Sequence, residues 1–180
     1  MALFHSTKYH ERNRDSPDGQ PLELYVLSGK RHAAGVEIDL AGRIAPGWEV
    51  FLSYSWIPIA TIDEVGPGGT LTGELEGQRP SRTPRHSGTL FTTWQLTPQW
   101  RIGGGLNARS SQTPNRNPPG IVAPSSVTGD LMAEHAFSKE VAFRFNVINL
   151  SDKLYADSLY SGHYVPGQPR TFHGTVTVRF

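Results

Sequence analysis

The sequence lacks several features on which large classes of protein depend. It has no cysteine among its 180 residues, so disulfide frameworks and thiolate metal sites are excluded. No apolar run approaches the roughly 20 residues of a membrane-spanning helix. The formal net charge is only +1, from 17 basic and 16 acidic residues, which gives no general reason to expect nucleic acid as a partner. Residues 1–8 also lack the basic and apolar regions of a secretory signal peptide.

Sequence signatures of enzymes and of bound groups are missing as well. Neither a Gly-x-Ser-x-Gly elbow nor a His-Glu-x-x-His pair occurs, and the seven histidines are scattered. The run Gly103-Gly-Gly105 has no following helix to hold a phosphate, so we expect it to ease strand curvature or close backbone approach. Glu37 and Asp39 would share a strand face without a nucleophile or a metal beside them. We therefore expect no enzymatic activity, no catalytic residue, no protein-bound metal and no cofactor.

What the sequence does contain is an alternation of apolar and polar residues that continues to its last residue. In residues 171–180, Phe172 and every second residue after it are apolar or small, and polar residues stand between them. The same alternation marks four further stretches: 36–41, 48–56, 100–109 and 141–147. Weaker versions cover about 86–96 and 124–137, and residues 1–10 are expected to add a strand of unassigned parity. The pattern predicts about eight strands and no helix.

The connections between these strands are of two kinds that alternate along the chain. Three are tight turns, at 45–47, 97–99 and 138–140. Four are long, polar and rich in Gly, Pro, Ser and Asn, at 11–30, 61–85, 109–125 and 151–170. In an antiparallel meander, all short turns then lie at one end of the sheet and all long loops at the other, as in outer-membrane barrels. The sequence therefore predicts an all-β fold, an antiparallel transmembrane β-barrel segment of about eight strands with short periplasmic turns and long extracellular loops.

Three features indicate that the apolar row faces lipid and the polar row faces water. Aromatic residues flank the short turns, as in interfacial girdles: Trp48, Trp94, Trp100 and Phe137. The polar row carries both signs of charge: Glu37, Asp39, Glu49, Asp130, Glu134, Arg43, Arg101, Arg109, Arg144 and Arg179. The alternating end of the chain resembles the signal by which outer-membrane barrels are recognised for assembly, carried here by Phe172, Val176, Val178 and Phe180. A soluble β-sandwich, with its apolar face turned inward, is the alternative that alternation alone leaves open.

Four stretches of the sequence resemble segments of a known protein family and follow one another in the same order as in that family. Asn146–Tyr155 resembles the Asn-Leu-x-Asp-Lys-x-Tyr element near the end of TonB-dependent receptors. Residues 160–171 resemble the last long loop that leads into the final strand of those receptors, and residues 77–86 and 25–37 match as well. Together these stretches are similar to the ferric-siderophore branch of the TonB-dependent outer-membrane receptors, in particular to its catecholate receptors.

The resemblance implies a place in a larger assembly. Members of the family have a barrel of about 22 strands, closed by an N-terminal plug domain with an energy-coupling segment before it. Residues 1–180 are thus expected to be the C-terminal part of such a barrel in the bacterial outer membrane, without plug or earlier strands and inactive alone. The implied partners are outer-membrane lipid, a ferric siderophore, the remaining barrel and plug, the barrel assembly machinery, and the inner-membrane protein TonB through the N-terminal part.

The resemblance also singles out candidate ligand-binding residues in the expected extracellular loops. Arg79, Arg82 and Arg85 could attract an anionic ferric siderophore, or they could anchor the base of a loop. A second group could contact an aromatic chelate or merely pack its own loop: Tyr160, His163 and Tyr164. The alternative function is a complete small eight-stranded outer-membrane barrel with a structural, adhesion or pore role.

Overall fold

The computed structural model describes residues 1–14, 25–65, 74–114, 120–161 and 163–180. The parts of the expected loops at 15–24, 66–73 and 115–119, together with residue 162, lie outside them. The described residues form ten strands: β1 (Ala2–Arg14), β2 (Tyr25–Ala45), β3 (Trp48–Glu64), β4 (His86–Gln95), β5 (Trp100–Arg109), β6 (Ser126–Ala136), β7 (Val141–Ile148), β8 (Ala156–Tyr160), β9 (His163–Pro166) and β10 (Thr171–Val178). Among these residues there is no helix long and apolar enough to cross a membrane.

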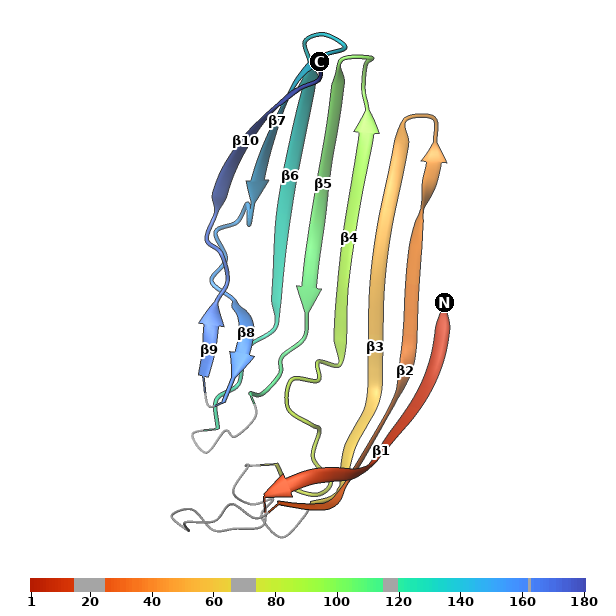
Figure 1. Cartoon of the computed structure of the whole chain (residues 1–180), viewed down its shortest axis with the longest axis vertical. Helices are drawn as coiled ribbons and strands as arrows, with labels where there is room; N and C mark the ends of the chain where they lie inside the picture. The colour runs from red at the N-terminus through yellow and green to blue at the C-terminus, as the bar shows by residue number, and fades with distance from the viewer. Residues whose placement is uncertain (15–24, 66–73, 115–119, 162) are drawn as a thin grey trace.

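Eight of the strands form one antiparallel sheet in the order β1-β2-β3-β4-β5-β6-β7-β10 (Figure 1). The expected all-β, antiparallel fold of about eight strands is confirmed. The remaining two strands, β8 and β9, pair with each other in a separate hairpin within the expected loop 151–170. Within the described part of the chain, β1 and β10 are the two edges of the sheet, so its eight strands do not close into a ring.

The short turns and the long connections lie at opposite ends of the sheet, as expected (Figure 1). Strands β2 and β3 have 21 and 17 residues, well above the roughly 9–11 residues that span a bilayer as a tilted strand. Both extend past the shorter strands toward the loop end, so the connections expected at 11–30 and 61–85 are partly strand. The loop-end part of this ladder is covered rather than free on both sides, because Ala60 and Ile62 are buried and Ile62 exchanges backbone hydrogen bonds with Gly77 and Gln78.

The cross-strand register gathers the apolar rows of the individual strands onto one face. Residues that lie directly opposite each other share a face of the sheet. Along the pair β2–β3, for example, Ile38 lies opposite Tyr54 and Leu40 opposite Leu52. Leu3 lies opposite Val36, which settles the parity of β1. We call this surface the apolar face and the opposite surface the polar face.

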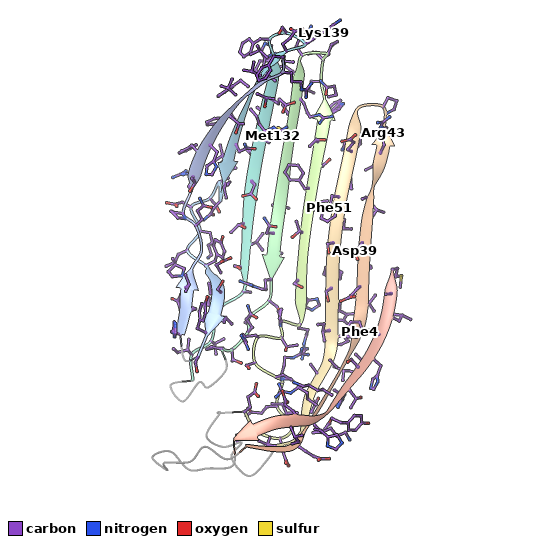
Figure 2. All side chains as sticks on the ribbon, viewed as in Figure 1. Phe4, Asp39, Arg43, Phe51, Met132 and Lys139 are labelled. Carbon is purple, nitrogen blue, oxygen red and sulfur yellow. The ribbon has the colours of Figure 1, made fainter. Side chains whose placement is uncertain are left out.

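The large sheet is a single layer of strands that carries side chains along its whole length (Figure 2). Large side chains on the apolar face remain exposed, including Trp94 (54%) and Val176 (64%). A soluble sandwich would cover such a face with a second sheet. The exposed apolar surface instead suits contact with lipid.

The aromatic residues beside the short turns lie on the apolar face, as the girdle interpretation expects. Trp48 donates its indole N–H to the Thr92 hydroxyl at 2.7 Å. The rings of Trp100 and His135 lie with centroids 4.5 Å apart, and the Phe137 ring meets His135 edge-on at 4.6 Å. These rings form a compact aromatic cluster at the turn end of the sheet.

On the polar face, oppositely charged residues pair across neighbouring strands. Arg144 on β7 approaches Glu134 on β6 to 2.6 Å, and Arg43 on β2 lies 3.8 Å from Glu49 on β3. The glycine run in β5 also acts on this face. A Cβ added at Gly105 would come within 2.7 Å of Phe91 Cδ2, so the missing side chain leaves room for that ring. The sequence predicted a close approach to the run Gly103–Gly105, and the group that makes it is the Phe91 ring.

Candidate ligand-binding site at the loop end

A buried asparagine organises the connection that follows β7. Asn149 is 1% exposed and has a φ of 51°, a left-handed conformation that asparagine tolerates better than most residues. Its side-chain amide donates to the carbonyls of Lys153 (2.9 Å) and Gln168 (3.0 Å), and its Oδ1 accepts the Lys153 N–H at 2.9 Å. Its backbone N–H donates to Asp130 Oδ1 on β6 at 2.8 Å. One side chain thus joins the start and the end of this connection to the sheet.

Two further contacts close the same connection. The Arg170 N–H donates to Asp152 Oδ1 at 2.9 Å, and the Gly167 N–H donates to the Tyr155 carbonyl at 2.8 Å. A Cβ at Gly167 would lie 2.0 Å from Tyr155 Cζ, so glycine here lets the Tyr155 ring pack against the backbone. The Asn-Leu-Ser-Asp-Lys-Leu-Tyr stretch is therefore a structural clasp that fixes the base of the β8–β9 hairpin.

The clasp and an arginine of β5 hold β8 over the polar face. Arg109 Nη2 donates to the carbonyl of Ala156 and, at 3.1 Å, to that of Asp157. Ala156 and Leu159 are buried together with Ala123. The hairpin is consequently packed on the loop end of the sheet and on the preceding connection.

A polar pocket of about 320 Å³ lies between β8 and the polar face. It is lined by Ser87, Gly88, Thr89, Asn107, Ala108, Arg109, Ser126, Thr128, Tyr155 and Asp157. Thr89 donates to Asn107 Oδ1 at 3.0 Å, and Asn107 donates to Asp130 Oδ2 at 3.1 Å. Hydroxyls, an amide, a guanidinium and a carboxylate therefore converge on one volume, which can bind a polar ligand by hydrogen bonds.

The sequence did not identify these residues as a binding site, and it indicated Arg109 only as one of the charges of the polar row. A signal was present for the six residues Ser87, Thr89, Asn107, Arg109, Ser126 and Thr128, since they are polar residues at the loop ends of β4, β5 and β6. None of the six candidate ligand-binding residues lines the pocket.

Of the three candidate arginines, Arg79 anchors its loop. Its Nη2 donates to the carbonyls of Ile57 (2.8 Å) and Pro58 (2.9 Å), where β3 departs from regular pairing with β2. Burial, and then the neighbouring Arg85 guanidinium, lower the pKa of Arg79 from its ordinary value. Of the two roles considered for Arg79, these contacts are those of a loop anchor.

Arg82 and Arg85 contribute to the loop through their backbones and leave their side chains exposed. The Arg82 N–H donates to the Thr113 carbonyl at 2.8 Å, and the Arg85 carbonyl accepts the Ile57 N–H at 2.9 Å. Both residues are exposed to solvent. Their guanidinium groups therefore remain candidates for contact with an anion.

A network of charges holds the same loop against β1 and β2. Arg31 donates to Glu11 and, at 3.0 Å, to Glu74, whose other oxygen accepts the Ser81 hydroxyl at 2.6 Å and the Ser81 N–H at 3.0 Å. Burial acts to raise the pKa of Glu74, but the Ser81 hydrogen bonds and Arg31 together hold it below its ordinary value. The loop is therefore fixed by an ionised carboxylate.

The three candidate residues of the last long loop lie on the β8–β9 hairpin. Tyr160 and His163 face each other across the two strands, with ring centroids 5.5 Å apart and an angle of 12° between the rings. Tyr164 is 41% exposed. The fold thus presents an exposed aromatic stack, on an element separate from the loop that carries Arg82 and Arg85.

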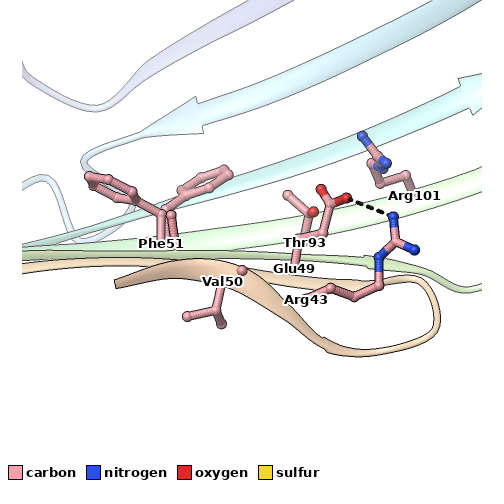
Figure 3. A pocket seen from close by; sticks show the side chains of 9 residues that line it. Arg43, Glu49, Val50, Phe51, Thr93 and Arg101 are labelled. Carbon is pink, nitrogen blue, oxygen red and sulfur yellow. Dashed lines mark ion pairs between the residues drawn. The ribbon is translucent and has the colours of Figure 1, made fainter. Parts of the chain in front are cut away.

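The turn end of the polar face carries a second pocket, of about 660 Å³ (Figure 3). Figure 3 shows Phe51, Glu49 and Thr93 on one side of the strands and Val50 on the other. The expected assembly-signal residues Phe172, Val176 and Val178 lie exposed along the apolar face of β10, from its loop end to its turn end. They lie opposite Val147, Phe143 and Val141 of β7, respectively. Phe180 follows the end of β10.

Comparison with known proteins gives consistent matches. Residues 1–150 match the family described as TonB dependent receptor-like, beta-barrel. The catecholate siderophore receptor Fiu of Escherichia coli K12 is 32% identical over 186 aligned positions, which cover 99% of this chain and 23% of the receptor. The ferric-pyoverdine 358 receptor of Pseudomonas putida is 32% identical over 93% of this chain and 19% of its own length. The chain thus spans about a fifth of the length of these curated relatives.

Solved structures agree with this fold. The crystal structure of the ferric-catecholate import receptor Fiu from E. coli, in its closed form, superposes with a TM-score of 0.80 at 27% identity, covering 99% of this chain and 24% of that one. The siderophore receptor PiuA from Acinetobacter baumannii gives a TM-score of 0.80 at 24% identity over 97% of this chain and 24% of its own, a likeness of fold.

Proposed function

The chain belongs to the TonB-dependent receptor family, and we propose that it forms the C-terminal part of the barrel wall of a ferric-siderophore receptor in the bacterial outer membrane. The observation that carries this proposal is the match to a catecholate siderophore receptor at 32% identity over 99% of the chain. The exposed apolar face of the single-layer sheet supports it independently, because such a face needs lipid around it.

In this proposal, the apolar face contacts lipid and the polar face lines the lumen. The edge strands β1 and β10 pair with further strands of the same barrel, since unpaired backbone groups are costly in lipid. The plug would occupy the lumen against the polar face, and TonB would supply energy through the N-terminal part. The barrel assembly machinery would recognise the last strand through Phe172, Val176, Val178 and Phe180.

We propose an anionic ferric catecholate as the ligand, approached from the loop end. The exposed guanidinium groups of Arg82 and Arg85 would attract its negative charge. The stacked rings of Tyr160 and His163 would contact its aromatic groups. The exposed Tyr164 is the third candidate contact on the hairpin. Arg79 would act indirectly, by holding the loop through the carbonyls of Ile57 and Pro58.

The test is equilibrium binding of a labelled ferric catecholate to the receptor that contains this segment. Replacing Arg82 and Arg85 together by glutamine should weaken binding several-fold and reduce its dependence on salt. The matched control is Arg43→Gln, at the turn end of the sheet, which should leave the affinity unchanged. If the double variant binds like the unaltered receptor, the arginine assignment is wrong, whereas absence of binding by the unaltered receptor would contradict the proposed ligand class.

A further inference from the structure

The apolar face of the sheet carries a groove near its loop end. The groove has a volume of about 380 Å³, within the range of about 300–1,000 Å³ found for small-molecule sites. Its lining residues are Leu52, Tyr54, His86, Ser87, Gly88, Thr89, Leu90, Leu106, Ala108, Arg109, Ser110, Ser125, Ser126 and Val127. They come from β3, β4, β5 and β6 and from the ends of those strands, at the middle of the sheet rather than at its β1 or β10 edge.

The groove exists because two small residues lie side by side between larger ones. Gly88 lies directly opposite Ala108, and this pair is flanked by Tyr54 on β3 and Val127 on β6. The neighbouring row toward the middle of the sheet is Leu52, Leu90 and Leu106, which gives the groove aliphatic walls.

A similar row closer to the turn end is covered instead. Gly104 lies opposite Thr92, but a Cβ at Gly104 would lie 3.3 Å from Leu131 Cδ2. Trp48 reaches Thr92 with its indole N–H. The Gly104–Thr92 row is thus covered by neighbouring side chains, whereas the Gly88–Ala108 row lies open in the groove.

The groove is polar only toward the loops. The Tyr54 hydroxyl lies 2.8 Å from His86 Nδ1, and the Trp56 ring stacks on His86 with an interplanar angle of 11°. The Ser110 hydroxyl oxygen accepts the His86 N–H at 3.0 Å. Ser125 adds a further hydroxyl among the lining residues. An occupant would therefore meet carbon along its length and hydrogen-bonding groups at one end.

We propose that this groove binds an acyl chain of a lipid of the surrounding membrane, with its polar end toward His86, Ser110 and Ser125. The inference rests on the proposed function, because it takes the apolar face to be the lipid-facing one. The groove is continuous with that face, and an amphiphile matches its division into an aliphatic length and a polar end. Its place in the middle of the sheet keeps it on the outer wall whichever strands join β1 and β10.

The test is photocrosslinking of the receptor that contains this segment, in phosphatidylcholine vesicles with a phosphatidylethanolamine that carries a diazirine on its acyl chain. Crosslinked positions are mapped by mass spectrometry. Crosslinks to Leu52, Leu90 and Leu106 should exceed those to Phe143 and Val176, on the same face, several-fold.

Two variants separate a built groove from general contact with lipid. Ala108→Trp fills the groove and should abolish the excess of crosslinks at the groove residues over those at Phe143 and Val176. Ala108→Leu is a smaller change that disturbs folding less, and it should reduce this excess. Ala133→Trp is the matched control, because Ala133 lies on the same face between Ile102 and Phe145, and it should leave the excess intact.

Two results would overturn the proposal, and they are distinguishable. Equal crosslinking of the groove and of Val176, or an excess that survives Ala108→Trp, would mean that the groove is not a lipid site although the face is lipid-facing. Crosslinks absent from the whole apolar face would instead contradict the proposed membrane location on which the groove depends.

Discussion

At the scale of single residues, Asn149 shows how a short motif acts. Its side chain satisfies three backbone groups in a site with almost no exposure to water. Buried backbone groups that lose their partners carry a large desolvation cost. The Asn146–Tyr155 motif, which indicates the family, is thus explained by the geometry of the connection that follows β7. Because this connection lies close to the candidate ligand-binding pocket, the motif supports that pocket.

Replacing Asn149 with alanine should destabilise the folded receptor by about 1–3 kcal/mol, because Lys153 and Gln168 would lose buried hydrogen-bond partners. Denaturant unfolding in detergent measures the loss, and proteolysis should become faster between residues 150 and 170. The control is Asn146→Ala, on the polar face of β7, with an expected change below about 0.5 kcal/mol. Equal effects of the two substitutions would count against the clasp.

Glu74 makes the fixing of its loop dependent on pH. Burial acts to raise the pKa of this carboxyl, but the Ser81 hydrogen bonds and Arg31 bring it below the ordinary value of 4.5. A carboxyl with a lowered folded-state pKa stabilises the fold above its unfolded-state pKa, and this contribution is lost as the pH falls through the lowered value. The loop should therefore be tightly held at neutral pH and released only in acid.

This release is measured by hydrogen exchange at the Ser81 amide, which Glu74 holds. Protection of Ser81 should fall in acid by more than the intrinsic exchange chemistry explains. Glu74→Gln should remove this additional pH dependence. Glu76→Gln, an exposed carboxyl of the same loop that accepts the Val65 N–H, should preserve it, and an unchanged profile in Glu74→Gln would refute the role of Glu74.

At the scale of strands, the two faces of β7 and β10 differ in what they can tolerate. Phe145 and Phe172 stack on the apolar face, with ring centroids 6.1 Å apart. On the polar face, Thr175 lies opposite Arg144. Adjacent residues of one strand thus occupy surroundings of opposite polarity.

Arginine in place of Val176 or Phe145 should block membrane insertion or cost about 2–4 kcal/mol near the middle of the bilayer. Arginine in place of Thr175 or Thr177 should be far milder, because these residues face the polar side. A folding titration into lipid vesicles compares the two rows. Similar losses from both rows would show that the lipid-facing assignment is wrong.

The β8–β9 hairpin is the element that the alternation pattern did not reveal. Its strands have five and four residues, too few to establish a period, and lie in a segment rich in turn-forming residues. Its placement depends on partners distant in sequence, namely Arg109 and Ala123. Local sequence therefore indicated a loop where tertiary contacts make a hairpin.

At the scale of the whole molecule, the sheet is open along β1 and β10. We expect that residues 1–180, exported by themselves behind a supplied signal peptide, do not restore growth of a receptor-deleted strain on a cognate ferric siderophore. The physical reason is that open edges cannot persist in lipid, so the sheet must close on itself, pair with another chain or aggregate. A closed barrel of eight strands would be filled by side chains.

The measurement is uptake of labelled iron with and without the proton-motive force. A positive control is the receptor that contains this segment, expressed from the same promoter. Energy-dependent uptake by the 180 residues alone would mean that they form a complete transporter.

The sequence by itself determined the eight strands of the large sheet, the apolar and polar faces of most of them, and the resemblance to the family. Period two is a local property, because successive side chains of a strand point to opposite faces. In the proposed receptor, the membrane and the lumen keep those faces chemically distinct. The lengths of the connections determined which end of the sheet carries the loops, and the Asn149 motif indicated the family although its hydrogen-bonded role could not be read from its letters.

Only the tertiary structure decided the loop-end site and the lipid-facing groove. Arg79 was one of three similar arginines until its contacts with Ile57 and Pro58 distinguished it as an anchor. The Gly88–Ala108 groove depends on the register of β4 and β5, which places two small residues opposite each other. Such features arise between segments that are distant in the chain, and residue type and local spacing do not specify which distant groups will meet.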